Sequence, residues 1–406
     1  MNRVKKWMGS LYHFKRFRSA LNKMEHFPIS QERLVYQCPL NESKRRNLTF
    51  QQINRPLLKH LELAYPHILH VGVTTLCNLR CPACPTGTAS LGRPGGHLDF
   101  DVFRRTVDSL RDYLLFMLFW DWGEPMLHPR LPDMIAHAAK SQIRTVISTN
   151  GNVKCSEERI EHLISAQPST MIVCVDGADQ ETYQSYRMGG RLEVVLQTIR
   201  RLANAKEKMG AAHPLIEVRS LATRHTEHQM PTLLKLAQDS GADLFTVKTL
   251  RPYNYRGSNL DETFVPESEK LSRYCYKGSR REARLRTDFL SKGALCCAKP
   301  LYAPTLNSDG TLAFCSYAQH GDEFFGSVKN DEIKTVWNSC SSRDRRVRFL
   351  RAGGTLSCRT CFFRGDHAPT IIHQVPLHRM PDGIEVEAPQ TPESFLERVA
   401  GKSPER

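Results

Sequence analysis

The sequence predicts an α/β fold in which a parallel sheet is wound or closed as a barrel. Between residue 67 and about residue 250, six short apolar segments alternate with helix-like segments. Such alternation is typical of parallel strands joined by covering helices. Three cysteines follow the first apolar segment directly, and in such sheets the chemistry lies where strands end and loops begin.

The predicted elements follow one another in a regular order. Strands are expected at 67–74, 114–120, 144–148, 170–175, 215–221 and 244–249, and helices at 100–113, 131–140, 157–165, 192–209 and 231–239. Ser156 suits the N-cap of the third helix, and Gly210 and Gly241 suit the ends of the last two. These patterns do not distinguish a partly closed barrel from an open sheet.

The composition is that of a globular protein. Its 406 residues are enough for two domains, and an apolar content of 40% is ordinary. No apolar run reaches the roughly 18 residues of a membrane span, and the N-terminus lacks the apolar core of an export signal. We therefore expect the thirteen cysteines to be metal ligands and free thiols in a cytoplasmic protein.

The net charge of +15 is concentrated near the N-terminus. Residues 1–24 carry seven Lys or Arg and no acid, and their apolar residues recur every three or four positions. This pattern predicts a basic amphipathic helix, which either packs on the protein's own body or lies on an anionic surface at the inner side of the membrane. The basic run at 280–286 has no interleaved aromatic residues, so no nucleic-acid partner is expected.

Cys77, Cys81 and Cys84 supply three thiolates at C-x3-C-x2-C spacing. Structural zinc and iron–sulfur sites use four protein ligands, whereas a site that does chemistry keeps one position open. The spacing differs from those of ferredoxins, which argues against a plain electron carrier. The alternative is a zinc site with a distant fourth ligand, or three unpaired core thiols.

This motif resembles the signature of the radical S-adenosylmethionine (radical SAM) superfamily. The resemblance implies a partial (β/α)6 TIM-like barrel, with a [4Fe–4S] cluster on the three cysteines. It further implies that S-adenosylmethionine (SAM) binds the bare iron and is cleaved reductively to a 5′-deoxyadenosyl radical, which takes hydrogen from a substrate. A flavodoxin or ferredoxin type of protein would supply the electron.

Three further loops carry the resemblance. Trp122-Gly-Glu-Pro125 is similar to the family's Gly-Gly-Glu-Pro motif, with Trp122 in place of the first glycine, and Ser148-Thr-Asn-Gly151 is similar to its ribose-lining segment. Cys174-Val-Asp-Gly177 replaces a serine of the family by Cys174, and Arg187 then suits the carboxylate of SAM. The resemblance thus implies SAM contacts at Gly123, Glu124, Pro125, Ser148, Asn150 and Arg187. Taken alone, the first two segments are also common turns, and Cys174 is also consistent with a buried free thiol.

A second set of cysteines lies near the C-terminus. Cys297, Cys315, Cys358 and Cys361, with Gly310 between the first two, resemble the auxiliary-cluster domain called SPASM, or its shortened form Twitch. No cysteine follows Cys361, so the resemblance implies one auxiliary [4Fe–4S] cluster held by all four thiolates. Zinc on the same thiolates is the alternative. Gly310 suits a hairpin tip.

These observations predict five segments. They are a basic amphipathic helical N-terminal extension (1–60), a radical SAM core (61–250), a connector (251–295), a small α+β auxiliary domain of SPASM/Twitch type (296–365) and a partly disordered tail (366–406).

The resemblance implies a radical SAM oxidoreductase, but it leaves the substrate open. We expect dehydrogenation or epimerisation of a small carbohydrate-like, glycan-like or aminocyclitol-like molecule, with the auxiliary cluster taking the second electron. One alternative is a maturase that modifies a ribosomal peptide or a protein side chain. Another is a non-catalytic, metal-stabilised binding protein, in which the loops at Glu124, Asn150 and Arg187 would have no purpose.

Overall fold

The computed structural model describes most of the chain. The described ranges are 17–57, 64–250, 260–268, 270–271, 274–277, 282–285, 297–318, 323–352, 354–355, 357 and 371–399. Of these, residues 52–57, 261–262, 274–277, 282–285 and 352 are described by their backbone alone. The predicted helix at 1–24 therefore lies mostly outside the described residues, and only its end, at 17–22, is helical within them.

Six parallel strands form the centre of the molecule, and they neighbour one another in sequence order. They are β3 (Ile68–Val71), β4 (Phe116–Phe119), β5 (Arg144–Thr149), β6 (Thr170–Cys174), β7 (Leu215–Ala222) and β8 (Leu244–Thr249). The helices between them are α3 (Phe100–Leu110), α4 (Leu131–Lys140), α5 (Glu157–Ser165), α6 (Gln180–Tyr186), α7 (Leu192–Lys208) and α8 (Met230–Asp239). The six predicted strands, the five predicted helices between them and the partial barrel are confirmed, and α6 is an additional helix.

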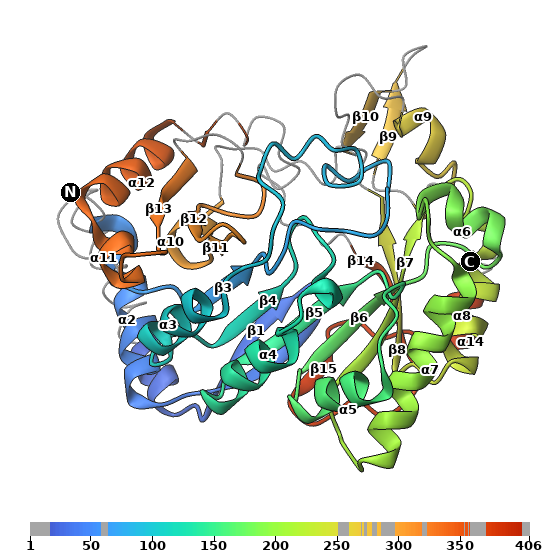
Figure 1. Ribbon diagram of the computed structural model, residues 1–406, viewed down its shortest axis with the longest axis horizontal. Coiled ribbons are helices and arrows are strands. Elements are labelled where there is room, and N and C mark those ends of the chain that lie inside the picture. Colours follow the sequence, from blue (N-terminus) through green and yellow to red (C-terminus); the bar gives the residue numbers. More distant parts are fainter. Residues whose placement is uncertain are drawn as a thin grey trace, which may run out of the picture.

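The helices form because one face of each is apolar, and a side chain caps the first turn of α3, α5 and α6. In α3, the Asp99 carboxylate accepts a hydrogen bond from the N–H of Val102 at 2.9 Å, while Phe103 and Val107 are fully buried. Ser156 caps α5 as predicted, accepting from the N–H of Arg159 at 3.2 Å. Figure 1 shows α3, α4, α5 and α7 together on one face of the sheet.

Strands from the C-terminal part of the chain extend this sheet at both edges. Beside β3 lie β11 (Thr305–Leu306), β12 (Thr311–Ala313) and β13 (Phe324–Ser327), and beside β8 lies the antiparallel β14 (Ile371–Pro376), which gives ten strands among the described residues. The hairpin of β11 and β12 turns at Gly310, whose φ of +76° favours glycine. The predicted hairpin tip is therefore confirmed, and the auxiliary segment is continuous with the core sheet.

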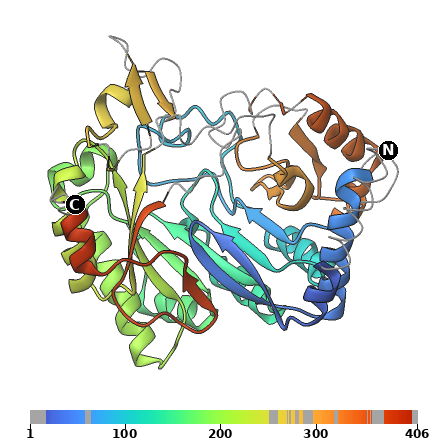
Figure 2. The ribbon, with the colours of Figure 1, turned by 180° about the vertical axis from the view of Figure 1, so that it is seen from behind.

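The predicted helical extension is wrong for residues 26–39. These form a hairpin of β1 (His26–Gln31) and β2 (Leu34–Pro39), followed by α2 (Glu42–Leu57). Alternate residues of β2 are buried, among them Tyr36, whose ring lies 4.8 Å from that of Phe116 and whose hydroxyl lies 3.0 Å from the Thr170 hydroxyl. The hairpin covers the face of the sheet opposite the helices (Figure 2), so tertiary packing overrides the helical pattern.

The tail predicted to be partly disordered is ordered within residues 371–399. Besides β14 it contains β15 (Ile384–Val386), which pairs with β2, and α14 (Pro392–Val399). Phe395 of α14 is fully buried, with its ring 5.7 Å from that of Phe245. The tail is mostly polar, but a few apolar residues such as Phe395 pack on the core. These contacts are enough to order residues 371–399.

The remaining described elements are short. They are η1 (Pro125–Leu127), η2 (Glu227–Gln229), α9 (Leu260–Phe264), β9 (Tyr274–Lys277), β10 (Glu282–Leu285), α10 (Lys299–Tyr302), α11 (Ile333–Asn338) and α12 (Cys340–Ala352). The helices α11 and α12 are separated at Ser339, whose hydroxyl accepts from the N–H of Ser342 at 3.1 Å and starts the second helix. None of the helices in the described ranges combines the length and apolar character that crossing a membrane requires.

Candidate functional site

The three cysteines of the first motif lie in the long loop between β3 and α3. This cysteine loop passes over the ends of the strands in Figure 1. Cys81 is buried, whereas Cys77 and Cys84 are partly exposed. Burial, with smaller effects from the neighbouring thiols of Cys84 and Cys77, raises the pKa of Cys81 to about 11, although the charge of Arg187 counteracts the rise. The N–H of Cys84 donates to the carbonyl of Cys81 at 3.2 Å, so these two cysteines lie in one turn of the loop.

Arg187 follows α6 and lies against the cysteine loop. Its Nε donates to the Asp176 carboxylate at 2.5 Å, and its Nη1 lies 3.7 Å from the sulfur of Cys81. Asp176 is almost fully buried and also accepts from the N–H of Leu221 at 2.7 Å. Burial lowers the pKa of Arg187, but the charge of Asp176, together with the neighbouring groups of Cys174, Cys81 and Tyr186, outweighs this and keeps the pKa well above its ordinary value. A permanent positive charge is therefore held beside Cys81.

Asn150 comes from the loop after β5 and reaches the same place. Its side-chain amide donates to Asn78 at 2.9 Å and lies 3.8 Å from the sulfur of Cys77. The side-chain carbonyl oxygen of Asn150 accepts a hydrogen bond from the backbone N–H of Asn152 at 2.7 Å. The amide is thereby fixed between the cysteine loop and the end of β5.

The Glu124 carboxylate forms hydrogen bonds with other residues of the protein. It accepts hydrogen bonds from the N–H of Met126 at 2.9 Å, the Thr149 hydroxyl at 2.6 Å and the N–H of Asn150 at 2.7 Å. Burial raises the pKa of Glu124, and these three donors counteract the rise. The side chain thus joins the loop after β4 to the loop after β5. Its predicted contact with the amino group of SAM stays a prediction.

Gly123 can only be glycine at this position. A Cβ there would lie 2.1 Å from the carbonyl oxygen of Thr74, and the N–H of Glu124 donates to the carbonyl of Leu76 at 2.9 Å. The backbone of this motif therefore lies directly on the residues that lead to Cys77. Pro125 begins the short helix η1 and is buried.

Two further sequence candidates lie side by side on neighbouring strands. The hydroxyl of Ser148 on β5 and the thiol of Cys174 on β6 are 4.0 Å apart. Burial raises the pKa of Cys174, so the neutral thiol is favoured at neutral pH.

The residues of the cysteine loop fit an iron–sulfur cluster. Among the described residues, no group of three or more His, Cys, Asp or Glu side chains converges closely enough to hold a single metal ion. A four-iron cluster does not require this, because each thiolate binds a separate iron. Arg187 and Asn150 also place donors next to the sulfurs, and such donors are a known means by which proteins tune clusters.

The auxiliary cysteines are only partly within the described residues. Cys297 lies just before α10, and Cys315 follows β12. Cys358 and Cys361 lie outside the described residues. The structure therefore places two of the four predicted ligands, at the edge where the sheet passes into the auxiliary segment.

Sequence reasoning missed a cluster beside this edge. Arg93, in the cysteine loop, lies 3.0 Å from both the Asp121 carboxylate and the Asn307 side-chain oxygen. Arg93 and Asp121 are both buried, with 11% and 3% of their side chains exposed. No local pattern marks them, because Asn307 is more than 200 positions away in the sequence.

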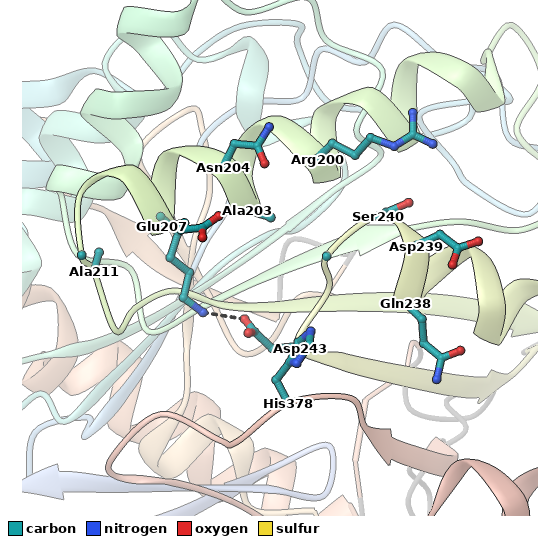
Figure 3. Close-up of a pocket in the computed structure, with 13 residues that line it drawn as sticks. Arg200, Ala203, Asn204, Glu207, Ala211, Gln238, Asp239, Ser240, Asp243 and His378 are labelled. Atoms are coloured by element: carbon teal, nitrogen blue, oxygen red, sulfur yellow. Dashed lines mark hydrogen bonds and ion pairs between the residues drawn. The ribbon is translucent and has the colours of Figure 1, made fainter.

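A groove lies at the other end of the strands. It measures about 680 Å³ and is bordered by the ends of α7 and α8 and by Asp243, which precedes β8. Lys206 and Asp243, which both border the groove, form an ion pair with nitrogen and oxygen 2.7 Å apart, and Figure 3 shows Asp243 with this pair as a dashed line. The groove contains none of the predicted site residues.

Comparison with known proteins identifies the class of this fold and site. Residues 71–217 match the model of the radical SAM superfamily, and residues 296–362 match that of the SPASM iron–sulfur cluster-binding domain. The chain is a radical SAM enzyme. More particularly, it belongs to those members that carry a C-terminal SPASM domain, and its cofactors are SAM and [4Fe–4S] clusters.

Individual proteins show the same relationship. The chain is 27% identical to the tungsten-containing aldehyde ferredoxin oxidoreductase cofactor-modifying protein of Pyrococcus furiosus, over 73% of this chain and 87% of that one. It is 28% identical to the PqqA peptide cyclase of Granulibacter bethesdensis, over 49% and 51%. The structure of Streptococcus suis SuiB bound to S-adenosylmethionine has the same fold, with a TM-score of 0.52 and 14% identity over 79% of this chain and 75% of that one.

We expect Arg187→Lys to weaken SAM binding about tenfold, since lysine keeps the charge but loses the planar fork that pairs with a carboxylate. Equilibrium dialysis of reconstituted protein with radiolabelled SAM measures this. Arg191→Lys, at an exposed position before α7, is the matched control and should bind normally. Unchanged affinity in Arg187→Lys would remove Arg187 from the SAM site.

Proposed function

We propose that this protein is a radical SAM maturase that modifies a peptide or a protein side chain. The supporting observation is the likeness of the core to a peptide cyclase, together with a likeness across core and auxiliary domain to a cofactor-modifying protein. The carbohydrate-like substrate expected from the sequence has weaker support, because neither relative is named for a sugar.

In this proposal Cys77, Cys81 and Cys84 hold the cluster that binds SAM. When the cluster is reduced and has SAM bound, the cluster and SAM together would supply a carbon-centred radical that removes hydrogen from a substrate carbon. Arg187, held by Asp176, places a fixed positive charge beside Cys81 for the SAM carboxylate. Asn150 is oriented by Asn152 and Glu124 toward the ribose, and Gly123 and Pro125 shape the backbone there.

Cys297, Cys315, Cys358 and Cys361 hold the auxiliary cluster in the same proposal. The β11–β12 hairpin pairs with β3, so Cys315 lies at the same edge as the cysteine loop. A substrate would then bind near both clusters, where the auxiliary cluster can accept an electron. An extended peptide suits such a site because it can reach across both segments with one side chain at the radical.

Substrate-dependent cleavage of SAM tests the proposed substrate class. Reconstituted protein, dithionite and SAM are incubated with short peptides encoded beside its gene or with the aminocyclitol 2-deoxy-scyllo-inosamine. We expect one of the peptides to stimulate formation of 5′-deoxyadenosine and to lose about 2 Da, as removal of two hydrogens requires. Oxidation of the aminocyclitol, with the peptides unchanged, would instead support the carbohydrate alternative.

A further inference from the structure

Trp122 occupies the place where the radical SAM motif has its first glycine, and its backbone is fixed to the cysteine loop. Its carbonyl oxygen accepts a hydrogen bond from the Thr86 hydroxyl at 2.6 Å, two residues after Cys84. On the other side, Gly123 packs against Thr74, close to the start of the same loop. The backbone at Trp122 is thus held near the start of the cysteine loop and again just after Cys84.

The side chain of Trp122 contacts a different segment, the auxiliary loop, which we define as residues 315–318. The indole Nε1–H donates to the carbonyl of Ser316 at 2.7 Å. The indole ring lies edge-on to Tyr317, with the ring centroids 5.8 Å apart. Because Ser316 directly follows Cys315, this contact reaches the residue next to a predicted cluster ligand. Glycine at position 122 could make neither contact.

Arg93 and Asp121 form a second link between the same two loops. Arg93 extends from the cysteine loop, pairs with Asp121 and donates from Nη2 to the carbonyl of Ala318 at 2.7 Å. Hydrogen bonds that involve a charged group are stronger than neutral ones, and this link is largely buried. The cysteine loop, the loop after β4 and the auxiliary loop therefore form one connected unit.

We propose that Trp122 is a positioning residue that couples the SAM-binding loop to the auxiliary loop. SAM bound at Gly123 and Glu124 orders the backbone that Trp122 shares, and the indole then holds Ser316 and Tyr317 in place. Ordering one loop lowers the entropy cost of ordering the other, and such coupling is reciprocal. The inference relies on SAM binding, which belongs to the family, and is independent of the substrate.

Hydrogen exchange measures this coupling without turnover. The N–H of Ala318 donates to the carbonyl of Cys315 at 3.1 Å, so its exchange reports opening of the auxiliary loop. In reconstituted full-length protein without reductant or substrate, we expect SAM to slow exchange in the segment 314–318 by about tenfold. In Trp122→Gly most of this slowing should disappear, although the variant still binds SAM, and the Arg93 link to Ala318 should carry what remains.

Two further variants show whether the effect is specific to the indole of Trp122. Trp122→Phe loses the indole N–H but keeps an aromatic ring, and we expect it to lose at least about half of the SAM-dependent slowing. Tyr113→Leu changes an aromatic ring that lies before β4, away from both loops, and packs against Tyr65, so it should leave the slowing intact. The proposal is overturned if SAM slows exchange in Trp122→Gly as much as in the natural protein. If the glycine variant does not fold, undiminished slowing in Trp122→Phe has the same meaning. The proposal is also overturned if SAM does not slow exchange in the natural protein.

The reciprocal measurement adds an independent readout. Tyr317→Leu removes the ring against which the indole packs, far along the chain from the predicted SAM contacts. If the loops are coupled, this variant should bind SAM more weakly by a factor of about two to ten in equilibrium dialysis. Unchanged affinity in Tyr317→Leu would contradict the coupling, whatever substrate the enzyme acts on.

Discussion

Replacing Cys81 by alanine is expected to abolish cleavage of SAM to 5′-deoxyadenosine. The variant leaves two thiolates for a cluster that needs three, so the cluster should be lost. The loss should exceed the roughly 10–100-fold that removal of an outer-sphere partner costs. The assay is anaerobic, driven by dithionite, and quantifies 5′-deoxyadenosine.

Other cysteine variants make this result interpretable. Cys340→Ala changes an exposed thiol on α12 and should retain full activity. Cys358→Ala should still cleave some SAM, uncoupled from product formation, because it affects only the auxiliary cluster. Cleavage that persists in Cys81→Ala would show that the cysteine loop does not hold the SAM-binding cluster.

Replacing Glu32 by alanine should lower the free energy of unfolding more than any other substitution discussed for this protein. Glu32 lies in the β1–β2 turn and pairs with Arg219 on β7 and, at 2.8 Å, with Lys248 on β8. Its side chain is only 17% exposed, so removing it leaves two largely buried cations without this partner. Breaking a buried pair in this way costs about 3–5 kcal/mol of the free energy of unfolding.

Glu42 offers the matched control. It pairs with Arg46 at 2.8 Å, but both side chains are more than two-thirds exposed. Glu42→Ala should therefore change the free energy of unfolding by no more than about 0.5 kcal/mol. Chemical denaturation measures both variants. Equal effects would mean that the hairpin turn is not anchored by its charges.

The Glu32 pair also sets a pH dependence. Burial would raise the pKa of Glu32, but the charges of Arg219 and Lys248 outweigh it and hold the pKa far below the ordinary value. The stabilisation is therefore fully present above the unfolded-state pKa of about 4.3, and it is lost as the pH falls below that value. In Glu32→Gln this component of acid destabilisation should be absent.

The central fold could be predicted because its signals are local. Each strand–helix unit shows its own change of periodicity, and a cap such as Ser156 lies within a few residues of the helix it starts. The hairpin at 26–39 and the tail at 371–399 could not be predicted in this way. Their strands are ordered by distant partners, as where Val35 pairs with Glu385.

The site shows the same division between local and distant signals. Short motifs with fixed spacing marked Cys77, Asn150 and Arg187, and the structure brings these side chains to one place. The orientation of Glu124 toward Thr149 and the position of Trp122 against Ser316 depend on contacts between loops. A motif in the sequence carries no information about such contacts.

The number of irons per chain tests the two-cluster assignment most directly. The full chain, reconstituted without oxygen, is assayed for iron and acid-labile sulfide. We expect about eight irons per chain, from one cluster on Cys77, Cys81 and Cys84 and one auxiliary cluster, and about four in Cys81→Ala. A chain that holds only zinc, or the same iron content in both proteins, would contradict the assignment.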